Sequence, residues 1–349
     1  MAASTSDFVL DIWYFAGLST DVKKGDMIRR EIAGHPITLG REDNGQAFAL
    51  SDICPHRAAP LSEGCLKAGT VECPYHGWRF NISDGHCEDI PALCEGQDMA
   101  VEKIKVRTFP TQENGALIWV YIASDKTFNG TPKITPPQFS FAARKATLDD
   151  ALVLNCHVDH AVIGLMDPAH GPYVHRQWWW RSEHSMHEKA KDFAPSDKGF
   201  TMVAHSPSSN SFAYKLLGGK PVTEIQFQLP GIRTETIKVG QKTILSFTAV
   251  TPIGETQTEI RQIFFTDHLL FKLLTPVIKI GAKKFLRQDA NMVDLQQMGL
   301  KHNPSLLLIE DSDTQAKWYF ALKKAWAKSQ QTGAEFINPV KAKTLRWRS

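Results

Sequence analysis

The sequence predicts an α+β protein with two domains, an all-β domain followed by a larger domain that contains an antiparallel sheet. The chain has 349 residues, a length that usually divides into two domains. Residues 30–125 contain short apolar runs separated by turn residues, and five longer runs within residues 201–265 suit antiparallel strands. Residues 124–137, rich in Pro, Gly, Thr and Lys, are the best candidate for a linker. We therefore expect the domains to be residues 1–130 and 131–349.

Turn residues divide the first domain into hairpins. Residues 36–39 and 47–50 flank the dipeptide Asn44-Gly45, which is favoured in tight hairpin turns. Residues 78–82 alternate in polarity before the turn Ser83-Asp84-Gly85. Further strands are expected at residues 101–106 and 116–122.

The second domain ends in a helical pattern. Apolar residues recur at helical spacing from Trp318 to Trp326, with lysines off that stripe. Ser312 or Asp313 can cap the start of this helix, and Gly333 can end it. The strands expected in this domain are residues 201–206, 223–229, 233–239, 242–251 and 256–265. The run Trp178-Trp179-Trp180 is expected in core packing or at an interface, with a pocket wall as the alternative.

The composition is that of a soluble globular enzyme, with 42% hydrophobic and 22% charged residues. The formal net charge of +3 is small, so we expect neither a nucleic acid nor a membrane as a partner. The six cysteines are expected to be reduced, and Met1–Asp11 lacks the pattern of a signal peptide, so a cytoplasmic protein is expected. The apolar run 267–280 is broken by Lys272, Pro276 and Lys279. We expect it to be buried or to cap a substrate, with a surface anchor as the alternative.

The chemistry of the first domain is indicated by two short loops, Cys54-Pro-His56 and Cys73-Pro-Tyr-His76. Two thiolates and two imidazoles are metal ligands, and a pair of each is the ligand set of a Rieske [2Fe–2S] cluster, which passes on one electron at a time. Structural zinc is the alternative, but zinc fingers usually pair Cys with Cys and His with His. Here each loop carries one of each, so that each loop can offer one ligand to each of two irons.

A second candidate metal site lies further along the chain. His170 and His175, with a carboxylate, would make the two-histidine, one-carboxylate set of non-haem Fe(II) oxygenases. On a straight helix two residues five apart point in different directions, but Gly171-Pro172 is expected to break the helix and turn His175 back. Asp167, three residues before His170, can contact the ring nitrogen that the metal leaves free. The alternative is that these histidines are unrelated core or surface residues.

With both motifs, the chain resembles the oxygenase component of Rieske non-haem iron oxygenases, in its vanillate demethylase-like branch. The resemblance covers most of the chain and includes the opening Trp13-Tyr14. It implies a helix-grip fold with an antiparallel sheet for the second domain, and a head-to-tail homotrimer. It also implies that Asp167 bridges His170 to the cluster ligand His76 of the partner subunit.

The resemblance implies that the third iron ligand is an Asp at the start of a late helix. Asp289 is our choice and Asp294 the second candidate, while a helix N-cap is the alternative role for Asp289. Relatives often carry an Asn three or four residues before the bridging Asp, where this chain has Gly164 and Ile163.

The expected function is that of a terminal oxygenase. It would use O2 and electrons from a ferredoxin or a flavin-dependent NAD(P)H reductase to hydroxylate or demethylate a small aromatic or heterocyclic substrate. A separate reductase is expected because the sequence has no nicotinamide-binding glycine motif. One alternative is a cis-dihydroxylating dioxygenase, and the other is a Rieske electron carrier without oxygenase activity.

Overall fold

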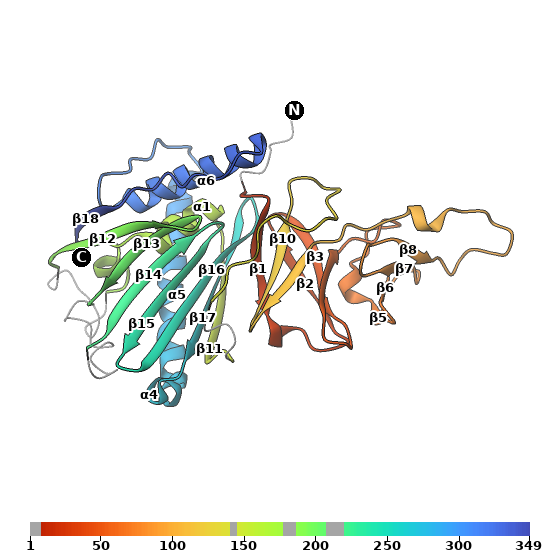
Figure 1. Cartoon of the computed structure of the whole chain (residues 1–349), viewed down its shortest axis with the longest axis horizontal. Coiled ribbons are helices and arrows are strands. Elements are labelled where there is room, and N and C mark those ends of the chain that lie inside the picture. The colour runs from red at the N-terminus through yellow and green to blue at the C-terminus, as the bar shows by residue number, and fades with distance from the viewer. Residues whose placement is uncertain (1–7, 140–144, 177–185, 207–219) are drawn as a thin grey trace. The chain divides into compact units, whose positions relative to one another are not determined.

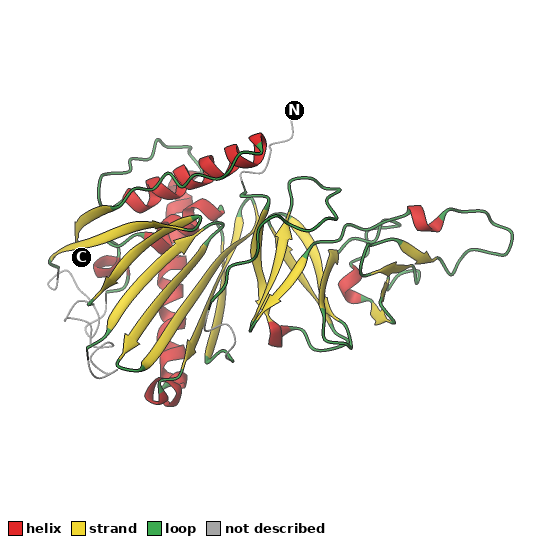
Figure 2. Cartoon of the chain, in the orientation of Figure 1, coloured by secondary structure: helices red, strands yellow, loops and turns green. Residues whose placement is uncertain are grey.

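The computed structural model describes residues 8–139, 145–176, 186–206 and 220–349 (Figure 1). Trp178–Trp180 lie outside these residues. The chain forms two compact units, Leu10–Arg144 and a second unit made of Met1–Val9 with Lys145–Ser349. Strands dominate both units (Figure 2).

The first unit is built from three small antiparallel sheets. One has the order β1-β10-β9 and another β2-β3-β4, while a third, β5-β6-β7-β8, carries the second cluster loop. The strands are β1 Ile12–Leu18, β2 Met27–Ile32, β3 His35–Arg41, β4 Ala47–Ser51, β5 Cys65–Lys67, β6 Thr70–Glu72, β7 Arg79–Asn81, β8 Cys87–Asp89, β9 Thr111–Asn114 and β10 Leu117–Ile122. Three short 3-10 helices, Ser19–Asp21, Leu61–Glu63 and Val101–Lys103, connect them.

The predicted hairpin around Asn44-Gly45 is confirmed, because β3 and β4 pair in antiparallel register with Leu39 opposite Ala49. The strand expected at residues 101–106 is wrong. Val101–Lys103 form one 3-10 turn, and of the rest only Lys105 makes a bridge, to His86. A short run of β-branched residues with lysines between them is compatible with either conformation, so periodicity alone did not decide it.

The first compact unit also extends beyond residue 130, the expected end of the first domain. The Trp13 indole donates a hydrogen bond to the carbonyl of Ile134 (2.7 Å), and the Asn114 amide donates one to Pro137 (3.2 Å). These bonds hold most of the expected linker against the first unit. Near the N-terminus, Phe8 belongs to the second unit, where its ring stacks on that of His157.

The second unit is one eight-stranded antiparallel sheet with helices packed on it. The strand order is β11-β17-β16-β15-β14-β13-β12-β18. Its strands are β11 Leu148–Leu154, β12 Glu188–Ser196, β13 Gly199–His205, β14 Val222–Gln228, β15 Ile232–Val239, β16 Lys242–Gly254, β17 Gln257–Thr266 and β18 Lys343–Arg348. Its helices are α1 Val158–Met166, α2 Gly171–Val174, α4 Leu269–Leu273, α5 Thr275–Leu300 and α6 Thr314–Thr332.

Two long helices accompany the sheet. Helix α5 crosses one face of it (Figure 1) and packs along the edge strand β11. Helix α6 begins after Asp313 and ends at Gly333, whose φ of +69° is the left-handed conformation that glycine adopts at helix ends, as predicted. The buried face of α6 includes Tyr319, Leu322 and Trp326.

The expectation that residues 267–280 are buried is wrong for most of the segment. Phe271 is buried, whereas Leu269, Leu273, Val277 and Ile280 are exposed. An apolar run shows that a segment contains hydrophobic side chains, but in a helix only one face can pack on the sheet. No helix among the described residues is long and apolar enough to cross a lipid bilayer.

Candidate metal centres

The two cluster loops of the first unit have the same backbone conformation. In the first, the Cys54 amide donates to the carbonyl of Ala59 (2.9 Å) and the Ala58 amide donates to Cys54 (2.8 Å). In the second, Cys73 repeats the pattern with Trp78 (2.8 Å) and Gly77 (3.1 Å). Each loop is thus closed into a turn by the same two backbone hydrogen bonds.

Each turn is completed by a residue with positive φ, +58° at Ala58 and +72° at Gly77. This conformation is strained for residues with a Cβ and natural for glycine. At Gly77 an added Cβ would also lie 3.2 Å from the ring of Pro91, so this position has both a conformational and a spatial reason to be glycine.

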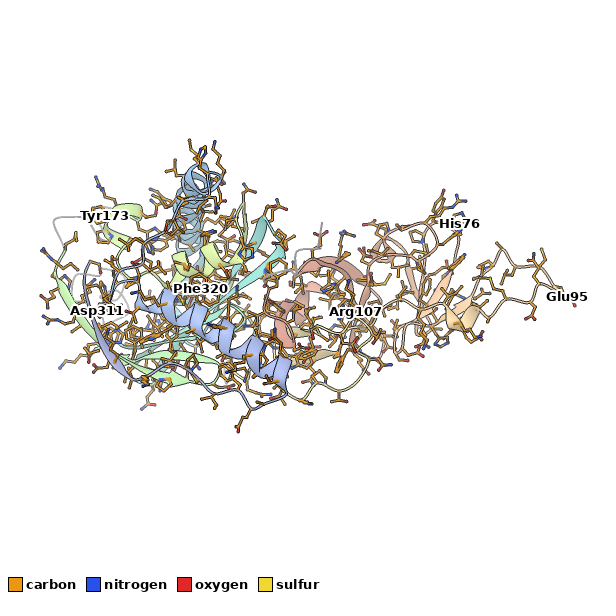
Figure 3. The ribbon with its side chains drawn as sticks, turned by 90° about the horizontal axis from the view of Figure 1, so that it is seen from above. His76, Glu95, Arg107, Tyr173, Asp311 and Phe320 are labelled. Carbon is orange, nitrogen blue, oxygen red and sulfur yellow. The ribbon has the colours of Figure 1, made fainter. Side chains whose placement is uncertain are left out.

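The four predicted cluster ligands come together at the tips of these loops. The rings of His56 and His76 have centroids 4.5 Å apart, and the buried thiols of Cys54 and Cys73 are close enough to perturb each other. Figure 3 labels His76, which lies at the edge of its unit. His56 stacks on Trp78 with centroids 4.7 Å apart and rings 4° from parallel.

One observation in particular shows that these residues fit a metal cluster. Nδ1 of His76 is buried and has no hydrogen-bond partner among the described residues, as expected for a nitrogen that ligates a metal. Burial, together with the neighbouring Cys73, raises the pKa of the Cys54 thiol to about 11. A thiol with such a pKa is not a ligand until a cation displaces its proton, so metal binding at this site would release protons.

A buried carboxylate that sequence analysis missed supports the first loop. Asp52 accepts hydrogen bonds from Thr38 Oγ1 (2.7 Å), from Arg29 (2.6 Å), and from both the amide (2.6 Å) and the hydroxyl (2.9 Å) of Ser62. Asp52 lies two residues before Cys54, so it fixes the start of the loop to β2, β3 and the helix at Leu61–Glu63. An isolated Asp after a strand gives no signal in a single sequence.

The second candidate centre brings together three residues from two distant segments. Nε2 of His170 and Nε2 of His175 are 3.1 Å apart, and Oδ1 of Asp289 lies 3.1 Å from the second and 3.8 Å from the first. A metal bound at about 2.1 Å to ligands at right angles places those ligands about 3 Å apart. The three atoms therefore fit one metal ion on one face, and they are the only such group of three among the described residues.

The backbone reaches this geometry differently from the prediction. Helix α1 ends at Met166 and the chain turns through Asp167–His170. Gly171-Pro172 then begins the short helix α2 instead of breaking one, because proline in a first helical turn loses no hydrogen bond. This single turn brings His175 back to His170.

Three side chains of helix α5 contact His175. The ring of Phe285 stacks on it (3.4 Å between centroids), and Asp289, one turn later on the same face, meets Nε2. Gln288 Oε1 lies 3.1 Å from Nδ1. Because an amide oxygen only accepts, this contact favours the tautomer of His175 with hydrogen on Nδ1, which leaves Nε2 available to a metal. His175 is 1% exposed, so this orientation is fixed by packing as well.

Asp167 lies beside His170 on the side away from the ligand nitrogen. Its Oδ2 is 3.6 Å from His170 Nδ1, too far for a hydrogen bond, while Oδ1 accepts one from the amide of Ala169 (2.7 Å). Burial lowers the pKa of His170, but the carboxylates of Asp167 and Asp289 more than offset it and raise that pKa above its ordinary value.

The second candidate for the third ligand does not join the site. Asp294 is exposed, and its Oδ1 accepts a long hydrogen bond (3.5 Å) from the Asn155 amide. It follows Asp289 by five residues, which places it on a different face of α5. The N-cap alternative for Asp289 is also wrong, because Asp289 lies inside a helix that begins at Thr275.

The three residues face a cavity of about 520 Å³ inside the second unit. The sheet contributes Arg233, Thr248, Ile260 and Gln262, and α5 contributes Phe285 and Leu286. The cavity is mixed in polarity and large enough for a small organic molecule.

Comparisons with known proteins agree with this description. Residues 12–110 match the family model of the Rieske [2Fe-2S] domain. The chain is 35% identical over 175 residues to the oxygenase component of dicamba O-demethylase from Stenotrophomonas maltophilia, covering 48% of each chain. A crystal structure of dicamba monooxygenase bound to dicamba superposes with a TM-score of 0.73 at 23% identity, over 92% of this chain and 99% of that one. A Pseudomonas putida CBB5 NdmA mutant with theobromine gives 0.72 at 17% identity, over 92% of both chains.

The sequence matches are shorter than the structural ones. The alignments with the curated relatives that match first span about half of their length or less, 48%, 30% and 24%. The first unit is a Rieske domain, whose cofactor is a [2Fe–2S] cluster and not zinc. The structural likeness extends the shared fold over the second unit.

Proposed function

We propose that this chain, which contains a Rieske [2Fe–2S] domain and has the fold of dicamba monooxygenase, is a terminal monooxygenase. The observation that carries the proposal is the convergence of His170, His175 and Asp289 on one cavity in a chain that also has a Rieske domain. An electron carrier needs no such cavity with three metal-ligating side chains.

We propose that these three side chains hold a ferrous ion. Such an ion, gripped on one face, keeps positions open for O2 and supplies the oxygen chemistry when it is bound. The protein's part is to hold the ligands. Gln288 keeps the proton of His175 on Nδ1, Phe285 fixes its ring, and α5 presents Asp289 to both histidines. The walls of the cavity orient the substrate and limit the access of water.

We propose that Cys54, Cys73, His56 and His76 hold the cluster, which supplies one electron at a time. In a homotrimer, Asp167 would join His170 to His76 of the partner subunit. Support for this role comes from its position beside His170 Nδ1, a nitrogen that is buried and has no hydrogen-bond partner among the described residues. Asp167 can accept from that imidazole with the oxygen that Ala169 does not use.

The proposed substrate is a small aromatic or heterocyclic molecule, hydroxylated or demethylated. Dicamba O-demethylase and the theobromine-bound mutant are similar to this chain in sequence or fold, which supports the choice. For a methyl ether the balanced reaction is R–O–CH3 + O2 + 2 H⁺ + 2 e⁻ → R–OH + CH2O + H2O. One oxygen atom is inserted into a C–H bond of the methyl group, and the resulting hemiacetal breaks down to the alcohol and formaldehyde.

The two electrons require a donor. We propose a ferredoxin, a flavin-dependent NAD(P)H reductase or both, since the chain has no dinucleotide-binding glycine motif. We also propose that the protein works in the cytoplasm, because its six cysteines, all described, are free thiols and suit a reducing compartment.

The test combines metal analysis with product detection. The purified holoprotein should contain three irons and two sulfides per chain, and should release formaldehyde from some members of a panel of methoxy- and N-methyl-aromatic compounds when given O2 and a reductant. With labelled O2, one atom should enter the organic products. His175→Ala should keep the cluster spectrum and lose both the third iron and the formaldehyde. Two irons in the unmodified chain, or two labelled atoms in one product, would overturn the proposal.

A further inference from the structure

The surface at α4 and the start of α5 exposes an unusual number of large apolar side chains. Leu269, Leu273, Val277 and Ile280 are 69%, 68%, 68% and 72% exposed. Leu269 and Leu273 are four residues apart in α4, and Val277 and Ile280 three apart in α5, so each pair lies on one face of its helix. We call these four residues the apolar ridge. Isolated exposed leucines are common, but four large apolar side chains within twelve residues are not.

The ridge is held in place from behind. Phe271, on the opposite side of α4, is buried and packs with Ile237 and Ile244 of the sheet, and Ile278 of α5 packs against the same cluster. The Pro276 ring lies in the first turn of α5, where it is compatible with the helix. The ridge is therefore a fixed edge of the folded unit, with its apolar side chains turned to solvent.

The ridge also lies in a basic part of the chain. From residue 269 to residue 288 the sequence has four lysines and one arginine and no acidic residue. Lys272, Lys279 and Lys283 are exposed beside the ridge. The overall net charge of +3 hides this local concentration of positive charge.

We propose that the apolar ridge and its lysines bind peripherally to the surface of an anionic phospholipid bilayer. Apolar side chains on a helix flanked by lysines are the features that let a helix lie in the interface between headgroups and acyl chains. Each lysine near a negatively charged leaflet adds attraction. A two-fold contact between two copies through the ridge fits less well, because it would bring the same lysines together. The proposal departs from our expectation of no membrane partner and takes up the surface anchor that sequence analysis kept as the alternative for residues 267–280.

The experiment measures binding of the holoprotein to vesicles by flotation. The vesicles are pure phosphatidylcholine or phosphatidylcholine with about one third phosphatidylglycerol, each at low and at high salt. Binding should be strong only on the anionic vesicles at low salt. The double variant V277S/I280S should reduce the bound-to-free ratio at least tenfold. K272A/K279A/K283A should reduce it as much on anionic vesicles.

The matched control is L306S/L307S, which removes two exposed leucines elsewhere in the second unit and should bind like the unmodified protein. Folding of every variant is checked by the cluster absorption spectrum and by thermal unfolding. Equal binding to neutral and anionic vesicles, or no loss in V277S/I280S, overturns the proposal. So does a result in which no vesicle binds and V277S/I280S instead changes the oligomeric state in light scattering, since the ridge would then be an interface between copies.

Discussion

At the scale of single residues, the mononuclear centre depends on how His175 is oriented. Its two ring nitrogens have different neighbours, Gln288 at Nδ1 and the other proposed ligands at Nε2. A histidine ligand without a partner on its second nitrogen can rotate or change tautomer, and it then binds a metal more weakly. Gln288 is therefore a positioning residue.

Gln288→Ala should weaken iron binding at this centre by about tenfold to a hundredfold, the range typical of lost partners of histidine ligands. The measurement is an Fe(II) titration of chain from which only the mononuclear iron has been removed by a mild chelator. Gln296→Ala, which changes an exposed glutamine of the same helix, is the control and should leave the affinity unchanged. Equal affinities in both variants would show that packing against Phe285 alone orients the ring.

Asp289→Ala should remove the mononuclear iron and leave the cluster. Two neutral imidazoles without the carboxylate lose both a ligand and the negative charge that offsets the ion. Iron analysis should fall from three to two per chain, with the reduced cluster's EPR signal unchanged. Asp294→Ala, in the same helix, should keep three. Loss of iron in the Asp294 variant in place of the Asp289 variant would reverse the assignment.

At the scale of elements, Asp52 links the first cluster loop to two strands and a 3-10 helix. Asp52→Ala would leave the Thr38 hydroxyl and the Ser62 amide without their acceptor in a buried place. We expect a loss of about 2–4 kcal/mol in the stability of the first unit. The readout is bleaching of the cluster absorption on heating. Glu31→Ala removes the other, exposed partner of Arg29 and should change little.

His35, the first residue of β3, should make the stability of the first unit depend on pH. Burial, with the nearby positive charges of Arg107 and Lys126, lowers the pKa of His35 to about 4. The unfolded chain, with an ordinary pKa of 6.5, binds a proton between these values while the folded chain does not. The contribution of neutral His35 to the stability of the folded state is thus fully present above pH 6.5 and is lost as the pH falls toward 4.

His35→Gln should reduce this loss, by on the order of 1–2 kcal/mol between pH 7.5 and pH 4.5. Thermal unfolding of the first unit, followed by cluster absorption at both pH values, measures it. His302→Gln, an exposed histidine outside the first unit, is the control and should keep the full pH dependence. An identical pH dependence in the His35 variant would mean that other groups cause it.

The elements that the sequence predicted share strong local signals. Asn44-Gly45 marks its hairpin, apolar runs mark the five strands expected between residues 201 and 265, all of which are present, and Gly333 ends its helix. The prediction for residues 101–106 was wrong because their pattern suits two conformations. The prediction for residues 267–280 was wrong because hydropathy says what a segment contains and not which of its side chains meet the sheet.

At the scale of the whole molecule, the two candidate metal sites also differ in how far local sequence signals predicted them. The four cluster residues lie in two nearby loops with typical spacing, so that sequence alone brought them together. Asp289 lies more than one hundred residues after His175, and only a family resemblance connected them. Gln288 and Asp52 had no signal, because their roles come from contacts between elements that no local pattern encodes.

The wide separation of the mononuclear ligands sets an order of maturation during synthesis. All residues of the cluster loops leave the ribosome well before α5, and domains generally fold in the order in which they emerge. The second unit, by contrast, joins Met1–Val9 to the last half of the chain and cannot close until Asp289 is available. Cluster insertion can thus precede release of the nascent polypeptide, whereas the proposed ferrous site can be completed only after Asp289 has been synthesised. Iron starvation should accordingly yield molecules that are coloured but lack turnover before it yields colourless ones.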